Sequence, residues 1–169
     1  METTLFIDGE ERQARNSATY AIHNPARPSE LVGHAASAGI AEVDDAMQSA
    51  HNAFTSWSAT SLDGRASYLA KVAQELNRDA ADVEMRTRLF TQEHGKTLFE
   101  TTIEINRLAD RFAQVAGFAD VIKQEDEIKG AQFDTIVTRQ ARGVVTLIVP
   151  WNWPLAILGS KLPQALLAG

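Results

Sequence analysis

One short segment near the end of the 169-residue chain combines residue types that could carry out chemistry. Trp151, Asn152, Trp153 and Pro154 follow one another, so two large indole rings flank a single carboxamide. At a junction between a strand and a helix, the Asn152 NH₂ group could donate a hydrogen bond to an oxyanion, and the N–H groups of the helix start would add positive potential. The alternative is that Asn152 caps the helix, which is the commoner use of asparagine at a helix start.

The sequence on either side of this segment predicts the elements that would position it. Residues 143–149 form a short apolar run rich in β-branched side chains, which is typical of a strand buried on both faces in a parallel sheet. Pro150 ends the run, because proline has no N–H group for the ladder. After Pro154, leucines recur at helical spacing, at Leu155, Leu158, Leu162 and Leu166. We therefore expect a strand, a tight elbow and a helix whose first turn accommodates Pro154.

Earlier parts of the chain predict strands followed by helices. Residues 4–7 and 10–12 flank Asp8-Gly9, a dipeptide typical of a tight hairpin turn. Residues 19–23, 31–36 and 133–140 also have the pattern of strands, and residues 124–127 form an acidic run expected in a solvated loop. Apolar residues at helical spacing predict helices over residues 40–57, 62–90 and 98–122. We expect Ser37 or Gly39 to cap the first helix, Ser61 to cap the second, and Gly95 to end the second.

Composition argues against several classes of function. The formal charge is −6 and the basic residues are scattered, which argues against binding to nucleic acid or to anionic membranes. The absence of cysteine excludes disulfides and thiolate metal sites and fits a cytoplasmic protein, and the four histidines are too far apart in sequence to predict a metal site. The start of the chain lacks the pattern of a signal peptide. Residues 143–160 are uncharged over a length that could span a membrane, but their prolines favour the strand–elbow–helix interpretation.

Several short motifs follow one another along the chain. They are Phe6-Ile7-Asp8-Gly9-Glu10, Asn24-Pro25-Ala26, Ala50-His51-Asn52-Ala53-Phe54 with Trp57, Gln92-Glu93-His94-Gly95-Lys96, and Val149-Pro150-Trp151-Asn152-Trp153-Pro154 with Lys161-Leu162 and Ala168-Gly169. In this order they resemble the opening hairpin, the Asn-Pro-Ala turn, the first helix, the E-x-G-K helix end and the Pro-Trp-Asn-Phe-Pro segment of the aldehyde dehydrogenase superfamily. The resemblance covers nearly all 169 residues.

The resemblance implies an incomplete α/β fold, the N-terminal part of an aldehyde dehydrogenase. Its parts would be a hairpin, three helices, an oligomerisation-arm strand, and the first strand and helix of the dinucleotide-binding sheet. Residues 1–141 would form the hairpin, helices and arm, and residues 142–169 would begin the cofactor-binding and active-site segment. The arm would be the strand that begins at Phe133 and ends at Gln140, and it would join the chain to a neighbouring subunit in a homo-oligomer.

The resemblance also assigns roles near the elbow. The family oxidises an aldehyde to a carboxylic acid with NAD or NADP, and a cysteine thiolate attacks the aldehyde. The Asn152 carboxamide would donate to the resulting oxyanion, and Lys161 matches a lysine near the active site, although a surface role is equally open. Positions matching the wall around the cofactor are Ile148, Val149, Pro150 and Trp151. Trp153 and Ile157 match positions that face the substrate channel, and the family more often has Phe at the first of these.

The family's catalytic cysteine, general-base glutamate, cofactor-ribose lysine and glycine-rich loop all lie further along its sequence. This chain contains no cysteine, so the resemblance implies that it has no dehydrogenase activity alone. The alternative is a truncated, non-catalytic remnant that acts as an assembly or decoy subunit. The sequence does not identify the aldehyde and does not distinguish NAD from NADP.

Overall fold

A computed structural model describes residues 1–169 and divides them into two compact units. The first unit is Met1–Ala53 with Asp79–Asn106, and the second is Phe54–Arg78 with Arg107–Gly169. Two helices, α1 (Ile40–Ala59) and α4 (Leu98–Gln114), contribute residues to both units. The functional division predicted at residue 141 concerns a different property and stays a prediction.

The first unit opens with the predicted hairpin. Strands β2 (Leu5–Ile7) and β3 (Glu10–Arg12) pair antiparallel, with Leu5 opposite Arg12. Asp8 and Gly9 both have positive φ values, 60° and 76°, which is the conformation that a two-residue turn with the right twist requires. The hairpin prediction is therefore confirmed.

A second sheet in this unit has the strand order β1-β5-β4. The long strand β5 (Arg27–Ala36) pairs antiparallel with β4 (Thr19–Asn24) and parallel with β1 (Glu2–Thr3). Gly33 permits the second pairing, because a Cβ atom at this position would lie 2.2 Å from the carbonyl oxygen of Met1. The predicted strands at 19–23 and 31–36 are confirmed, and β5 begins four residues earlier than expected.

The predicted helix over residues 62–90 is two helices, α2 (Leu62–Leu76) and α3 (Ala80–His94). Asp79 caps α3 by accepting a hydrogen bond of 2.9 Å from the Ala81 N–H, so a new helix begins where the apolar spacing alone suggested continuation. The two outer boundaries are as predicted. The Ser61 Oγ accepts from the Gly64 N–H at 3.1 Å, and Gly95 ends α3 with φ 79°.

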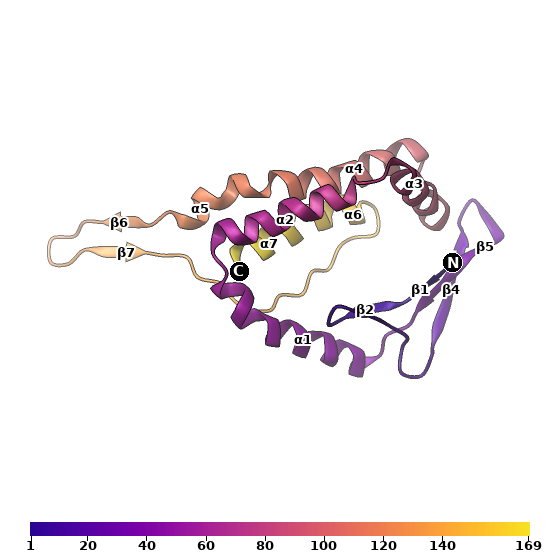
Figure 1. The fold of residues 1–169 in the computed structure, drawn as a ribbon, viewed down its shortest axis with the longest axis horizontal. Helices are drawn as coiled ribbons and strands as arrows, with labels where there is room; N and C mark the ends of the chain where they lie inside the picture. The colour runs from indigo at the N-terminus through magenta and orange to yellow at the C-terminus, as the bar shows by residue number, and fades with distance from the viewer. The chain divides into compact units, whose positions relative to one another are not determined.

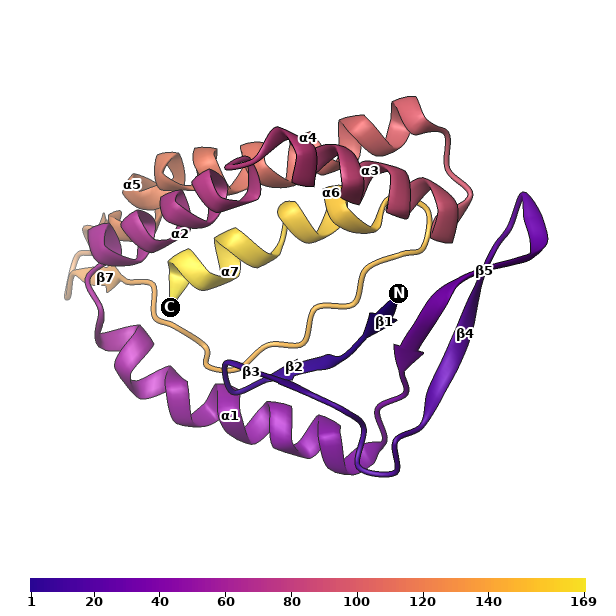
Figure 2. The same ribbon diagram turned by 45° about the vertical axis from the view of Figure 1, so that its right-hand side comes forward.

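The buried core of the second unit lies among its helices. Beyond α4 the chain continues as η1 (Val115–Phe118) and α5 (Ala119–Lys123), so the third predicted helix also ends earlier than expected. The C-terminal helices are α6 (Pro154–Gly159) and α7 (Leu162–Ala168), and α7 packs against α2 and η1 (Figure 2). The cluster is centred on Leu69, Ala73, Phe112, Val115 and Leu167.

A two-stranded arm follows α5 (Figure 1). Strand β6 (Asp126–Ile128) pairs antiparallel with β7 (Thr135–Val137). The acidic run that we expected in a loop therefore enters a strand at Asp126, and the predicted strand over residues 133–140 is shorter than expected. Ile128 and Ile136 on the arm are 58% and 62% exposed, so the arm presents apolar side chains to solvent.

The predicted strand over residues 143–149 is not formed. These residues follow the arm as a long segment without regular secondary structure, and no sheet of the chain includes them (Figure 2). A strand needs a partner for its N–H and C=O groups, and none pairs with this segment. The single helix expected after Pro154 is also divided, because Pro163 lies in the first turn of α7, a position that suits a helix start rather than a helix interior.

Candidate active site

The elbow at residues 150–154 connects the irregular segment to α6. Pro154 occupies the first turn of α6, and the first helical hydrogen bond runs from the Ile157 N–H to the Trp153 carbonyl at 3.0 Å. Trp153 thus holds the N-cap position and its side chain makes no capping hydrogen bond. Asn152 lies one residue before the cap and is exposed. The N-cap of α6 is therefore Trp153, and not Asn152 as the capping interpretation expected.

The four residues predicted to line the cofactor are two residues directly before the elbow and its first two residues. Ile148 and Trp151 are 80% and 83% exposed, Pro150 is also exposed, and Val149 is half-buried. These residues form no strand, and the side chains of Ile148 and Trp151 are mostly accessible to solvent. The arrangement gives an apolar wall of the kind that a planar ring could cover.

Lys161 joins the turn between α6 and α7 to this wall. Its Nζ atom donates a hydrogen bond of 3.3 Å to the Ile148 carbonyl oxygen. Lys161 is otherwise exposed and holds the N-cap position of α7. The contact brings together two predicted site residues that are 13 positions apart in sequence.

The two residues predicted to face the substrate lie at opposite ends of the first turn of α6. Trp153 and Ile157 are both half-buried. The Cζ atom of Arg107, on α4, lies over the Trp153 ring at 5.8 Å from its centroid. Arg107 could not be predicted as a site residue, because nothing in its local sequence distinguishes it from other arginines on helix surfaces.

A buried arginine holds the far end of α7. Arg65 is 7% exposed, and its Nε atom donates to the Leu167 carbonyl at 2.9 Å. The same side chain donates to the Ser58 carbonyl at 3.2 Å, and Trp57 Nε1 donates to the Leu166 carbonyl at 2.8 Å. These donors satisfy carbonyl groups at the C-terminal ends of α1 and α7, where a positive charge is favourable. Sequence analysis missed Arg65, which lies within a helix whose pattern only indicates its apolar face.

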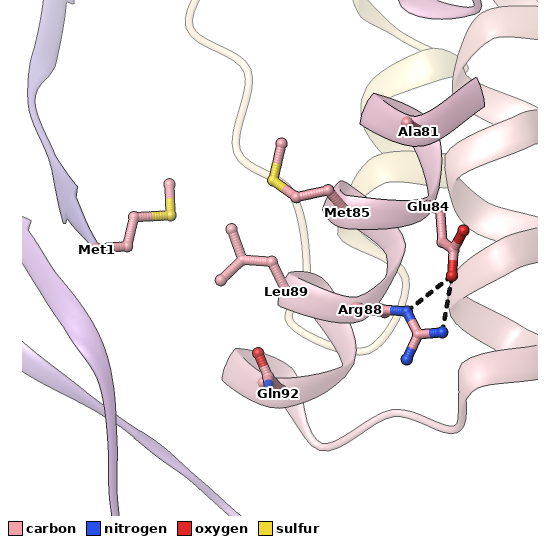
Figure 3. A pocket seen from close by; sticks show the side chains of 7 residues that line it. All are labelled: Met1, Ala81, Glu84, Met85, Arg88, Leu89 and Gln92. Carbon is pink, nitrogen blue, oxygen red and sulfur yellow. Dashed lines mark hydrogen bonds and ion pairs between the residues drawn. The ribbon is translucent and has the colours of Figure 1, made fainter. Parts of the chain in front are cut away.

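A separate groove lies in the first unit and contains none of the predicted site residues (Figure 3). Its volume is about 460 Å³ and its lining is mostly apolar, with Met1 on one side and Met85 and Leu89 of α3 on the other. The Glu84 carboxylate beside it accepts two hydrogen bonds from Arg88, at 3.0 and 2.7 Å. The groove therefore offers no nucleophile and no unpaired base, and we do not assign chemistry to it.

No group of three or more His, Cys, Asp or Glu side chains is arranged to hold a metal ion. None of the helices combines the length and the apolar character that crossing a membrane requires.

Comparison with known proteins identifies the family. The pattern of the aldehyde dehydrogenase family matches residues 12–169, which include all of the helices, the arm and the elbow. The chain belongs to the aldehyde dehydrogenase family. The α/β fold expected for the N-terminal part of this family is confirmed by the solved structures that follow.

Individual relatives agree with this assignment. The chain is 34% identical to Aminoaldehyde dehydrogenase 2 of Solanum lycopersicum over 171 residues, which cover 98% of this chain and 33% of the relative. The structure of PnpE in complex with nicotinamide adenine dinucleotide matches with a TM-score of 0.87 and 32% identity, over 100% of this chain and 34% of that one. An NADP dependent enzyme of E. coli gives a TM-score of 0.88 and 31% identity, over 99% of this chain and 34% of that one. The chain thus spans about a third of the length of these relatives.

Proposed function

We propose that this chain supplies the N-terminal part of an enzyme that oxidises an aldehyde to a carboxylic acid with NAD or NADP. The observation that carries the proposal is the family match over residues 12–169, since it includes every residue that we assign to the site. Solved relatives that hold NAD or depend on NADP support the choice of cofactor. Residues 142–169 begin the cofactor-binding and active-site segment, and residues 1–141 carry the arm.

Asn152 is the residue that we assign to chemistry. Its carboxamide lies at the exposed elbow, one residue before the N-cap of α6. We infer that its NH₂ group donates to the oxyanion formed when a thiolate attacks the aldehyde carbonyl. A donor that is already in position stabilises the charge that develops in the transition state without reorganising. The nucleophile comes from outside these 169 residues, because they contain no cysteine.

The wall before the elbow suits a nicotinamide cofactor. Ile148 and Trp151 present exposed apolar surface, and Val149 and Pro150 lie between them. When bound, NAD or NADP supplies the acceptor for the hydride that leaves the substrate. The Lys161 contact to the Ile148 carbonyl orients this wall, so we assign Lys161 a positioning role. Trp153 and Ile157, on the first turn of α6, face the aldehyde.

The substitution Asn152→Ala in the complete dehydrogenase tests the catalytic assignment. We expect kcat to fall by about 10²–10³-fold, which is the typical effect of removing one oxyanion donor from an enzyme. KM should change much less, because the donor acts chiefly on the transition state. Steady-state kinetics with an aldehyde and NAD or NADP measure both constants.

Ser61→Ala provides the matched control, because the Ser61 hydroxyl is a helix cap in this structure. That substitution should lower stability by about 1 kcal/mol and leave kcat unchanged. If Asn152→Ala behaves in the same way, with a lower melting temperature and near-normal kcat, then Asn152 is a structural residue and the assignment fails.

An assembly role is favoured by the arm. Ile128, Phe133 and Ile136 are 58%, 74% and 62% exposed, and both strands of the arm are short. Exposed apolar strands associate readily with other strands. We infer that the arm binds a second copy of the chain, whether or not the enzyme is active. The mass of the protein in solution tests this contact.

A further inference from the structure

A guanidinium group lies beside the residue that we place at the substrate channel. Arg107 on α4 is exposed, and its Cζ atom is 5.8 Å from the centroid of the Trp153 ring. None of the ion pairs in the structure involves Arg107. Asp110 follows three residues later on the same helix and is not paired with it. The positive charge of Arg107 is therefore not neutralised by a carboxylate.

The next turn of α4 packs against α6. A Cβ atom added to Gly159 would lie 3.2 Å from both Cβ and Cγ of Arg111, so the aliphatic stem of Arg111 packs against α6. Arg107 and Arg111 are four residues apart and share one face of α4. This face borders α6, with Arg107 over Trp153 at its beginning and Arg111 against Gly159 at its end.

An arginine placed over an indole ring is suited to bind an anion. The guanidinium is planar and always charged, and it keeps donors at its edge while one face contacts an aromatic ring. A carboxylate or a phosphate can accept two parallel hydrogen bonds from that edge. The ring also restricts the motion of the side chain, so less conformational entropy is lost when an anion binds.

We propose that Arg107 makes this enzyme selective for aldehydes that carry an anionic group, a carboxylate or a phosphate ester. The proposal rests on the proposed function, because Trp153 faces the aldehyde only in a working dehydrogenase. The anionic group binds the Arg107 guanidinium while the carbonyl reaches Asn152 at the elbow. An aldehyde that carries an ammonium group is repelled by the same charge, so the substrate class is opposite to the one that the name of the tomato relative indicates.

The experiment measures kcat/KM of the complete dehydrogenase for four aldehydes of equal chain length. Their far ends are neutral, carboxylate, phosphate ester and ammonium. The wild-type enzyme should prefer one or both anionic aldehydes, and the two anionic substrates distinguish which group is recognised. Arg107→Gln should lower kcat/KM for the preferred anion by about tenfold or more, chiefly through KM, because it removes a charge-assisted contact. The same variant should lower kcat/KM for the neutral aldehyde much less than for the preferred anion, and it should raise kcat/KM for the ammonium substrate.

Two further variants separate charge from packing. Arg111→Gln keeps the stem that packs on Gly159 and should retain the anion preference, whereas Arg107→Lys keeps the charge and should retain part of it. Added salt should weaken the preference of the wild type. The proposal is overturned if the wild type does not prefer an anionic aldehyde over the neutral one. It is also overturned if Arg107→Gln lowers kcat/KM equally for all four substrates. Failure to oxidise any aldehyde would instead reject the proposed function, and this inference with it.

Discussion

Two regions of the second unit both contain large apolar side chains, but the environments of these side chains are opposite. In the helical core, Leu69 and Leu167 are 2% and 0% exposed. At the wall formed by residues 148–151, Ile148 and Trp151 are 80% and 83% exposed. A helix satisfies its own backbone hydrogen bonds, so α2 and α7 can form and then bury their apolar faces against each other. A strand satisfies its backbone only through a partner, and no strand pairs with residues 143–149. Apolar character therefore indicates burial only when the partner surface is present.

The largest expected effect comes from truncating one residue in each region. Leu69→Ala removes a side chain from the middle of the core and should lower the free energy of unfolding by about 2–5 kcal/mol. Ile148→Ala removes a side chain of similar size from an exposed position and should change it by no more than about 0.5 kcal/mol. Urea unfolding of both variants measures the difference.

The prediction is wrong if the two variants lower the free energy of unfolding by similar amounts. That result would mean that Ile148 is buried in solution by a surface that pairs with the segment. Hydrogen exchange of residues 143–149 provides an independent check, since unpaired amides exchange quickly and those of a buried strand do not.

Local signals explain which parts of the fold could be predicted from the sequence. The Asp8-Gly9 turn, the Ser61 cap and the end of α3 at Gly95 each depend on a few neighbouring residues, and all three are confirmed. The break between α2 and α3 was missed although Asp79 is a good capping residue, because the apolar spacing continues across it. The strand at 143–149 was wrong for the opposite reason, since its formation depends on partners that its own sequence does not specify.

Residues of the site also differ in whether the local sequence identifies them. Asn152, Trp153 and Lys161 could be named because a compact motif contains them, and their roles stay predictions. Arg107 and Arg65 could not be named, because their contacts with Trp153 and with the Leu167 carbonyl join residues 46 and 102 positions apart. Such contacts depend on how helices pack, and the pattern of a single helix shows only which side is apolar.

A second exposed region, the arm, gives an effect of intermediate size. Ile136→Lys places a charge on β7 and should weaken self-association about tenfold or more, because the lysine would have to lose water in the contact. Thr138→Lys adds the same charge just beyond β7 and should have little effect. Light scattering over a range of protein concentrations measures the association. A protein that is monomeric at every concentration would contradict the assembly role.

The smallest expected effects concern two carboxylates of the first unit. One accepts backbone hydrogen bonds, and the other lies beside apolar side chains. Glu42 accepts hydrogen bonds of 2.8 Å from the backbone N–H groups of Arg15 and Gly39, and these bonds lower its pKa. Glu93 borders apolar side chains that include Met1 and Leu89, and the resulting desolvation raises its pKa, although the charge of His94 opposes the shift. One carboxylate is thus stabilised in its charged form and the other is penalised.

The signs of these two shifts predict opposite dependences of stability on pH. Because the pKa of Glu42 is lower in the folded state, its contribution is complete above the ordinary glutamate pKa, about 4.3, and is lost as the pH falls through the lowered value. Because the pKa of Glu93 is higher in the folded state, its destabilising contribution is complete above that raised value and disappears as the pH falls below the ordinary glutamate pKa.

Glu42→Gln should therefore lower the melting temperature slightly at neutral pH, and Glu93→Gln should raise it slightly. Glu11→Gln, which removes an equally negative and exposed charge, corrects for the change in net charge. Both differences should shrink as the pH approaches 3, so thermal unfolding of the three variants between pH 3 and 8 measures them. If all three variants follow the same curve, then net charge alone sets the pH dependence, and the hydrogen bonds to Glu42 do not stabilise the start of α1.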